Sequence, residues 1–225
     1  MIQRPDNLTE LVLSAIRQRL IDSSLPPGSG VSEAMLSKDL NVSKTPVREA
    51  LVRLRQIGLV EPTSRGLRVV VPTPRSIRDA FEMRAGLEST AARYAATRGT
   101  KEQKAQIVEL ARQSAEVANV FDDFRKVDQE FHMAIAAAAG NKLLHNTIED
   151  SLVLTQVLRQ RDIHVDRDFA PDGKEHIAVA RSIKSGNADT AAERLSGHTL
   201  RIMEQLLDAF ARENEDVRSG VGTLA

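Results

Sequence analysis

Three of the five histidines in this chain stand where a helix should be apolar. On the helix expected at 120–138, Asp128 and His132 are four residues apart, so their side chains project from one face a turn apart. His176 and His198 interrupt the apolar stripes of two further expected helices. Burying the four groups without partners would cost several kcal/mol, whereas a divalent ion would satisfy all of them.

One carboxylate and three imidazoles form an N₃O ligand set, which suits Zn²⁺ best and also Ni²⁺ or Mn²⁺. Four protein ligands around a six-coordinate ion would leave two positions, and a small carboxylate could fill them. Two plainer alternatives stay open. A lone buried histidine is usually a hydrogen-bonded core residue, and the ion could be purely structural. The remaining histidines, His145 and His164, fit no apolar stripe and are expected at the surface.

A buried arginine is the second unusual feature of the C-terminal part. Arg84 interrupts the apolar stripe of a helix expected at 76–98. A buried guanidinium group needs an anion, either a protein carboxylate or a bound ligand. Glu88, four residues further on the same face, would be the structural partner, and an organic acid would be the alternative.

Near the N-terminus, the segment from Ser43 to Leu51 combines short polar and basic side chains with a helical apolar stripe. A recognition helix presents such residues at its N-terminal end, where it enters the major groove of DNA. Lys44 would reach a guanine edge, and Thr45 and Arg48 would hold phosphates. The alternative is a solvated basic helix.

The elements around this segment follow a defined order. Turn and capping residues predict helix, helix, turn, helix and a hairpin whose tip carries Arg65 and Gly66, where backbone can approach a nucleic acid. This is the order of a winged helix-turn-helix domain. The expected helices are 8–22, 33–40 and 44–57, and the expected strands are 59–61 and 67–71.

Pro72-Thr73-Pro74 is a stiff segment and the best domain boundary. Beyond it the periodicity predicts six antiparallel helices, a bundle that can hold a cavity. Their ranges are 76–98, 101–118, 120–138, 142–161, 174–185 and 188–214. We therefore expect a mainly α protein with a winged domain at 1–72, a linker at 73–76, a helical domain at 77–215 and a tail at 216–225.

The composition excludes several classes of protein. The chain has 225 residues, 41% of them hydrophobic and 28% charged, which is enough for a packed core. It has no cysteine, so disulfides and thiol chemistry are excluded. No segment resembles a membrane span or a signal peptide, so a cytoplasmic protein is expected. In residues 1–75, Lys and Arg outnumber Asp and Glu by four, and in residues 76–225 Asp and Glu outnumber Lys and Arg by four. This asymmetry suggests that the first part binds a polyanion.

Residues 8–72 resemble the DNA-binding domain of the GntR family of bacterial transcription regulators. The resemblance rests on PPG at 26–28, LNVSKTPVREAL at 40–51 and RLRQIGLVEPTSRG at 53–66. It implies contacts to DNA from Ser43, Lys44, Thr45, Arg48, Arg65 and Gly66. Two positions depart from the family pattern. Lys44 stands where the family usually has Arg, which replaces bidentate guanine recognition by a point charge, and Ala34 stands where Arg is frequent.

Residues from about 76 to 210 resemble the FCD domain, the effector-binding part of one GntR subgroup. The matching segments are FEMRAGLESTAARYAA at 81–96, DQEFHMAIAAAAGNKLL at 128–144 and EHIAVARSIKSGNADTAAERLSGH at 175–198. The resemblance implies metal ligands at Asp128, His132, His176 and His198 and an effector contact at Arg84.

Together the two resemblances predict a homodimeric regulator, most simply a repressor, that binds a near-palindromic operator. A small carboxylate would control it by bridging the metal and Arg84. Two alternatives differ in class. In a direct metal sensor the ion alone is the signal. In a metal-dependent enzyme the ion activates water, but no general base is clearly placed beside the ligands, so no catalytic residue is expected.

Overall fold

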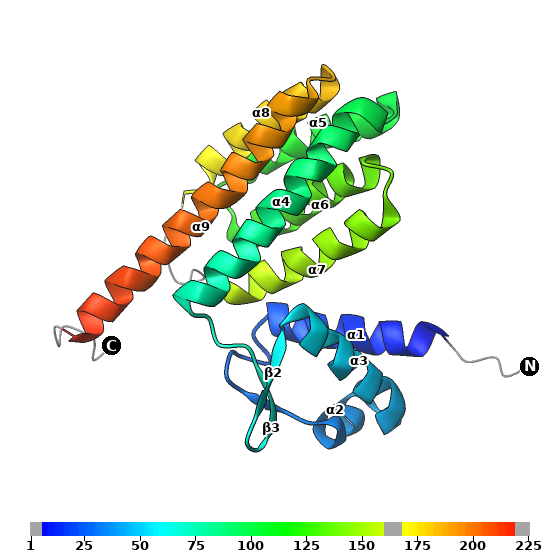
Figure 1. Ribbon diagram of the computed structural model, residues 1–225, viewed down its shortest axis with the longest axis vertical. Coiled ribbons are helices and arrows are strands. Elements are labelled where there is room, and N and C mark those ends of the chain that lie inside the picture. Colours follow the sequence, from blue (N-terminus) through cyan, green and yellow to red (C-terminus); the bar gives the residue numbers. More distant parts are fainter. Residues whose placement is uncertain (1–5, 160–167, 219–225) are drawn as a thin grey trace, which may run out of the picture. The chain divides into compact units, whose positions relative to one another are not determined.

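The computed structural model describes residues 6–159 and 168–218 of the chain. This part is mostly helical, with one small sheet. It divides into two compact units, one formed by residues up to Thr73 together with a segment from Val153, the other by the remaining residues. Figure 1 shows the sheet among the helices of the first unit, and the second unit as a group of helices alone.

The first unit has the order of a winged helix-turn-helix domain. Ser32 caps its second helix by accepting a hydrogen bond from the amide of Met35, and Asn41 ends that helix in the left-handed conformation. Gly58, with φ of +88°, ends the third helix in the same way. The elements are α1 (Asp6–Ile21), β1 (Gly30–Val31), α2 (Glu33–Leu40), α3 (Lys44–Ile57), β2 (Val60–Thr63) and β3 (Gly66–Val69).

The sheet of this unit has a third strand that the sequence analysis missed. The strand order is β1-β3-β2, and both pairs are antiparallel. In β1, Gly30 pairs with Arg68 and Val31 with Leu67. Two residues are too few to show a strand periodicity, which is why only the hairpin was predicted. The hairpin itself is present, with a tight turn between Thr63 and Gly66.

The six helices predicted beyond Pro74 are present, and they form the second unit except for the residues from Val153 to Leu158, which belong to the first. Their bounds are α4 (Pro74–Arg98), α5 (Lys101–Glu116), α6 (Phe121–Ala138), α7 (Lys142–Leu158), α8 (Ala170–Lys184) and α9 (Ala188–Arg218). The largest deviations are the start of α8, four residues before the expected position, and the end of α9, four residues after it. Proline is tolerated in the first turn of a helix, and Asp168 accepts a hydrogen bond from the amide of Ala170, so the polar stretch before 174 is partly helical.

Small residues let two of these helices approach closely. A Cβ atom at Gly173 of α8 would lie 2.6 Å from the Cα of Ala115 on α5, so no larger residue fits there. The close contact brings α8 beside the buried Ser114. Helix α4 packs along α9, as Figure 1 shows. These contacts place α4, α5, α6, α8 and α9 around one polar cluster inside an otherwise apolar core.

Candidate metal centre and nucleic-acid interface

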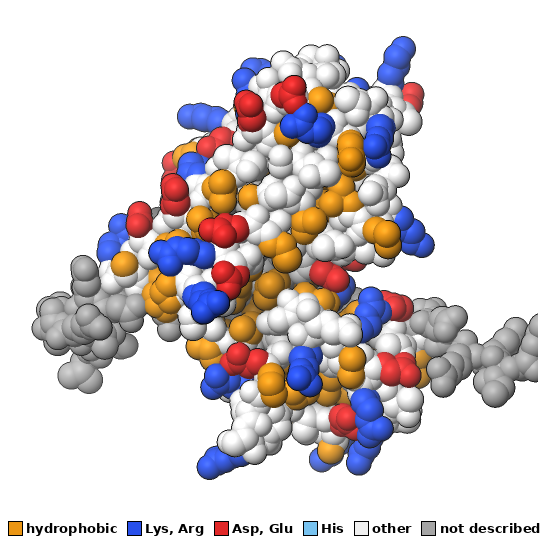
Figure 2. All heavy atoms as spheres, in the orientation of Figure 1, with side chains coloured by type: hydrophobic (Ala, Val, Ile, Leu, Met, Phe, Trp, Pro, Cys, Tyr) orange, Lys and Arg blue, Asp and Glu red, His pale blue; other side chains and the backbone are white. Residues whose placement is uncertain are grey.

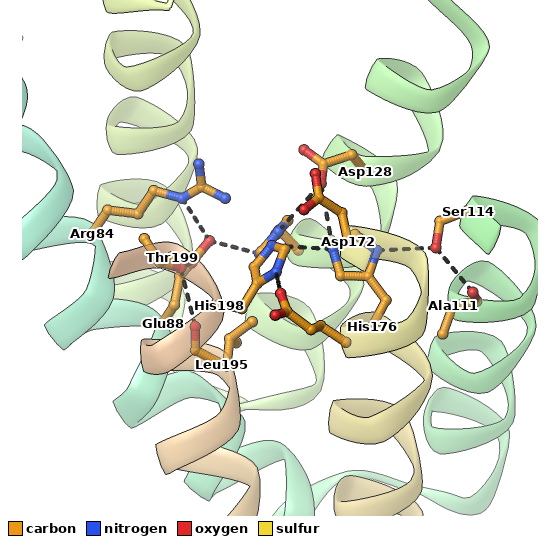
Figure 3. Close-up of polar contacts among 12 residues, drawn as sticks. Arg84, Glu88, Ala111, Ser114, Asp128, Asp172, His176, Leu195, His198 and Thr199 are labelled. Carbon is orange, nitrogen blue, oxygen red and sulfur yellow. Dashed lines mark hydrogen bonds and ion pairs between the residues drawn. The ribbon is translucent and has the colours of Figure 1, made fainter. Parts of the chain in front are cut away.

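The four residues expected to bind a metal lie together in the helical unit. One nitrogen or oxygen atom from each of Asp128, His132, His176 and His198 lies within 4.8 Å of the others, and all four residues are buried. Asp128 and His132 come from successive turns of α6, His176 from α8 and His198 from α9. Figure 3 shows Asp128, His176 and His198 pointing toward one another. Three helices thus bring four potential ligands, one carboxylate and three imidazoles, to one point.

Each imidazole turns its Nε2 atom toward this point. The Nε2 atom of His176 lies 3.4 Å from Asp128 Oδ1 and 3.3 Å from His198 Nε2. The Nε2 atom of His132 lies 3.6 Å from Asp128 Oδ1 and has no hydrogen-bond partner among the described residues, although it is buried. A buried nitrogen without a partner is costly, and a metal ion is one group that would remove the cost.

The opposite nitrogen of His176 shows which tautomer the ring adopts. Its Nδ1 atom lies 3.0 Å from the hydroxyl oxygen of Ser114. That hydroxyl already donates its single proton to the carbonyl oxygen of Ala111, at 2.9 Å. Ser114 must therefore accept from His176, so Nδ1 carries the proton and Nε2 has a free lone pair.

Carboxylates lie beside the outer nitrogens of the other two rings. His198 Nδ1 lies 2.7 Å from Glu175 Oε2, and because a carboxylate can only accept, this Nδ1 atom carries a proton. His132 Nδ1 lies 2.8 Å from Glu88 Oε1, an ion-pair contact without the geometry of a hydrogen bond. Outer-sphere acceptors of this kind orient the histidine ligands of protein metal sites. The donor set and its surroundings therefore fit a divalent ion.

The electrostatics of the cluster differ among its three rings. Burial lowers the pKa of His176 well below its usual value, with repulsion from His198 adding to it, and burial also lowers the pKa of His198 despite the nearby Glu175. Both rings are therefore neutral, as metal ligands must be. For His132, burial is outweighed by the charge of Glu88, which raises its pKa. Burial would raise the pKa of Asp128, but His132, His176 and Arg84 hold it well below the ordinary range.

A network of ion pairs surrounds the cluster. Arg201 pairs with Asp172 and Glu175, and Arg84 pairs with Glu88. The cluster therefore lies among charged groups inside the helical unit, where a bound cation would have carboxylates nearby.

Arg84 has the structural partner that the sequence analysis offered as one of its two alternatives. Its Nε atom donates to Glu88 Oε1 at 3.0 Å, and the two side chains are 2% and 1% exposed. Glu88 also accepts from the hydroxyl of Thr199 at 2.8 Å. Burial would raise the pKa of Glu88, but Arg84 and His132 bring it to about 2. In Figure 3 the terminal nitrogens of Arg84 extend beyond the Glu88 carboxylate.

Sequence reasoning missed most of the second layer of this site. Ser114 lies on the buried face of α5 with Ile107 and Ala111, so the same search for polar residues on an apolar stripe would have found it. Glu175 is next to a ligand in the chain, but its contact is with His198 on another helix. Asp172 fell in a segment predicted to be irregular. Contacts between helices leave no periodic signal in one sequence.

The residues expected at DNA lie on the accessible side of the first unit. Ser43 is the N-cap of α3, and Ser43, Lys44, Thr45 and Arg48 are exposed. Arg48 is held by Glu33 of α2, with Nε and one terminal nitrogen each 2.8 Å from a carboxylate oxygen. That contact, which the sequence analysis did not foresee, orients the arginine at the N-terminal end of α3.

The hairpin tip is also accessible. Arg65 and Gly66 are exposed, and Gly66 has φ of +129°, a conformation that L side chains rarely adopt. Thr63 stabilises the turn because its hydroxyl accepts from the amide of Arg65, at 3.2 Å. In Figure 2 basic side chains project from the molecular surface among acidic ones, and no histidine among the described residues is visible on that face.

The other two histidines of the chain are His145 and His164. His145 lies on α7 and is half-buried rather than fully at the surface, and it is not part of the cluster. His164 falls outside the described residues. Within residues 6–159 and 168–218, no helix is long and apolar enough to cross a membrane.

Comparison with known proteins agrees with both units. Residues 8–69 match the bacterial regulatory proteins of the gntR family, and residues 79–201 match the FCD domain. The HTH-type transcriptional repressor RspR of Escherichia coli is 26% identical over 214 residues, covering 93% of this chain and 92% of that protein. The Nta operon transcriptional regulator of Aminobacter aminovorans is 27% identical over 184 residues, covering 81% and 86%.

A solved structure shows the same fold. E. coli McbR/YncC superposes with a TM-score of 0.76 at 20% identity, covering 93% of this chain and all of that one. The relatives in sequence are named as transcription regulators, which rules against the enzyme considered from the sequence. The chain belongs to the GntR family of bacterial transcription regulators, in the group that joins a DNA-binding helix-turn-helix domain to an FCD domain.

Proposed function

We propose that this DNA-binding regulator is a cytoplasmic, homodimeric repressor whose FCD domain holds a divalent metal, most simply zinc, and responds to a small organic acid. Asp128, His132, His176 and His198 would hold the ion. The observation that carries the proposal is their convergence, with each imidazole Nε2 turned inward. Manganese or nickel would suit the same N₃O set.

The metal, when bound, would supply a Lewis-acid position for a carboxylate oxygen. The protein's own groups would do the rest. Arg84 lies beside the cluster through its contact with Glu88, and its terminal nitrogens would hold the other end of the acid. Aliphatic and aromatic neighbours of the histidines, such as Phe131, whose ring centroid lies 4.3 Å from that of His176, would exclude water.

In the first unit, Lys44, Thr45, Arg48, Arg65 and Gly66 would contact the DNA, with Ser43 at the start of the recognition helix. Two copies would bind the half-sites of a near-palindromic operator. We keep the domain boundaries proposed from the sequence, 1–72 and 77–215 with a linker at 73–76 and a tail from 216. Repression is favoured because RspR, a relative over nearly the whole chain, is named a repressor.

The direct test measures DNA affinity in three states of the protein. An operator would be selected from a pool of random duplexes, and its affinity measured by fluorescence anisotropy for the chelated protein, the zinc-loaded protein and the zinc-loaded protein with a panel of small carboxylates. The proposal predicts that an acid lowers the affinity only when zinc is bound. A change produced by zinc alone would instead favour a direct metal sensor, and no change in any state would leave the ion structural.

Replacing Arg48 by alanine should weaken binding to all DNA sequences, because a phosphate contact carries no sequence information. The slope of log affinity against log salt should fall in magnitude by about one. The matched control is Arg53→Ala, which removes an arginine from the same helix that is paired with Glu10 of α1. Titrations at several salt concentrations measure the affinity and the slope for both variants. An unchanged slope for Arg48→Ala would show that Arg48 does not contact a phosphate.

A further inference from the structure

The carboxylate of Glu175 contacts His198 of the cluster and is itself held by an arginine. Glu175 Oε2 accepts from His198 Nδ1 at 2.7 Å. The same carboxylate receives two hydrogen bonds from Arg201, from Nε at 2.7 Å and from a terminal nitrogen at 2.6 Å. Arg201 also contacts Asp172. Glu175 therefore has both oxygens fixed by a planar guanidinium group, which leaves one orientation for its contact with His198.

The arrangement joins two helices. Glu175 and Asp172 are on α8, whereas His198 and Arg201 are three residues apart on α9. The His198 ring is fully buried, while the side chains of Glu175 and Arg201 are 35% and 27% exposed. The carboxylate is thus held at the edge of the site, between solvent and a buried ring.

The contact between Glu175 and His198 matters because His176 lies on the other side of the His198 ring. His198 Nε2 lies 3.3 Å from His176 Nε2, a distance at which one ring could donate to the other. His176 keeps its proton on Nδ1 because of Ser114, so its Nε2 can only accept. If His198 carried its proton on Nε2, the two rings would form a hydrogen bond that uses both nitrogens and removes two metal ligands.

We propose that Glu175, oriented by Arg201, is a positioning residue that keeps the His198 proton on Nδ1 and thereby keeps both Nε2 atoms available to a metal ion. The proposal rests on the metal site described under the proposed function, although the effect on the tautomer is independent of any metal. Neither Glu175 nor Arg201 binds the ion in this account.

The test uses the full-length protein and two readouts. In Glu175→Ala, the Nε2–H tautomer of His198 should appear in ¹⁵N imidazole spectra of the chelated protein, whereas the original protein should show only Nδ1–H. The affinity for zinc, measured by competition with a chromogenic chelator, should fall about 10–100-fold. Glu175→Gln retains the size of the side chain and should give a smaller loss, because its amide oxygen can still accept from Nδ1.

The matched control is Glu109→Ala on α5. Glu109 also accepts two hydrogen bonds from one arginine, Arg112, but no contact of Glu109 with a histidine occurs among the described residues. This variant should change neither the tautomer nor the zinc affinity.

An Nδ1–H tautomer that persists in Glu175→Ala, or an unchanged zinc affinity in the folded variant, would overturn the proposal. Failure of the original protein to bind zinc would instead contradict the proposed function, and the spectra of the chelated proteins would still decide the role of Glu175.

Discussion

Replacement of His132 and His176 together by alanine should abolish retention of a divalent ion and lower the melting temperature of the protein as purified. The two rings come from different helices and supply half of the ligands, so the remaining Asp128 and His198 could not hold an ion in competition with water. Because a ligand that binds only the folded state stabilises it by mass action, an ion at about 1000 times its Kd contributes about 4 kcal/mol. The double variant should lose this contribution.

Elemental analysis of the purified proteins and thermal melts with and without a chelator measure both effects. The original protein should melt at a lower temperature after chelation, and the double variant should not respond to the chelator. His145→Ala, which removes a half-buried histidine outside the cluster, is the control and should retain the ion. A stoichiometric metal in the double variant would show that the ligand set is wrong.

Replacement of Arg84 by methionine should destabilise the metal-free protein by about 3–5 kcal/mol, because it leaves the buried Glu88 carboxylate without its guanidinium partner. The carboxylate cannot simply be hydrated, since it is 1% exposed and is tied to Thr199 and His132. Urea denaturation of the chelated protein measures the loss. Arg112→Met, which breaks an exposed pair with Glu109, is the control and should cost far less stability, because water screens an exposed pair.

The same variant bears on the two roles considered for Arg84. If the arginine also holds an organic acid, Arg84→Met should no longer be stabilised by carboxylates that stabilise the original protein. Retained stabilisation would leave Arg84 with the structural role alone. A loss of stability as small as that of Arg112→Met would contradict the buried ion pair itself.

Much of the helical unit could be predicted because its signals are local. Apolar residues at helical spacing and glycine or asparagine at the breaks gave the number of helices and most of their ends. The same apolar stripes identified Asp128, His132, His176 and His198 as candidate ligands, since a polar residue on an apolar stripe must be buried with a partner. Asp128 and His132 were found on one helix, and His176 and His198 on two others, so only packing shows that ligand atoms of the four lie within 4.8 Å of one another.

The features that sequence reasoning missed depend on contacts between elements. Strand β1 has only two residues, and it exists because β3 offers an edge to pair with. The Glu33 contact of Arg48 joins α2 to α3, and the Glu175 contact of His198 joins α8 to α9. No periodicity or spacing reports such pairs.

A thermal-shift screen with small organic acids, run on the protein as purified and again after chelation, would decide whether the effector site depends on a metal. We expect particular carboxylates to raise the melting temperature of the purified protein and this effect to disappear after chelation, because the acid needs both the ion and Arg84. Stabilisation that survives chelation, or a melting temperature that responds to neither chelator nor acid, would contradict a metal-dependent effector site.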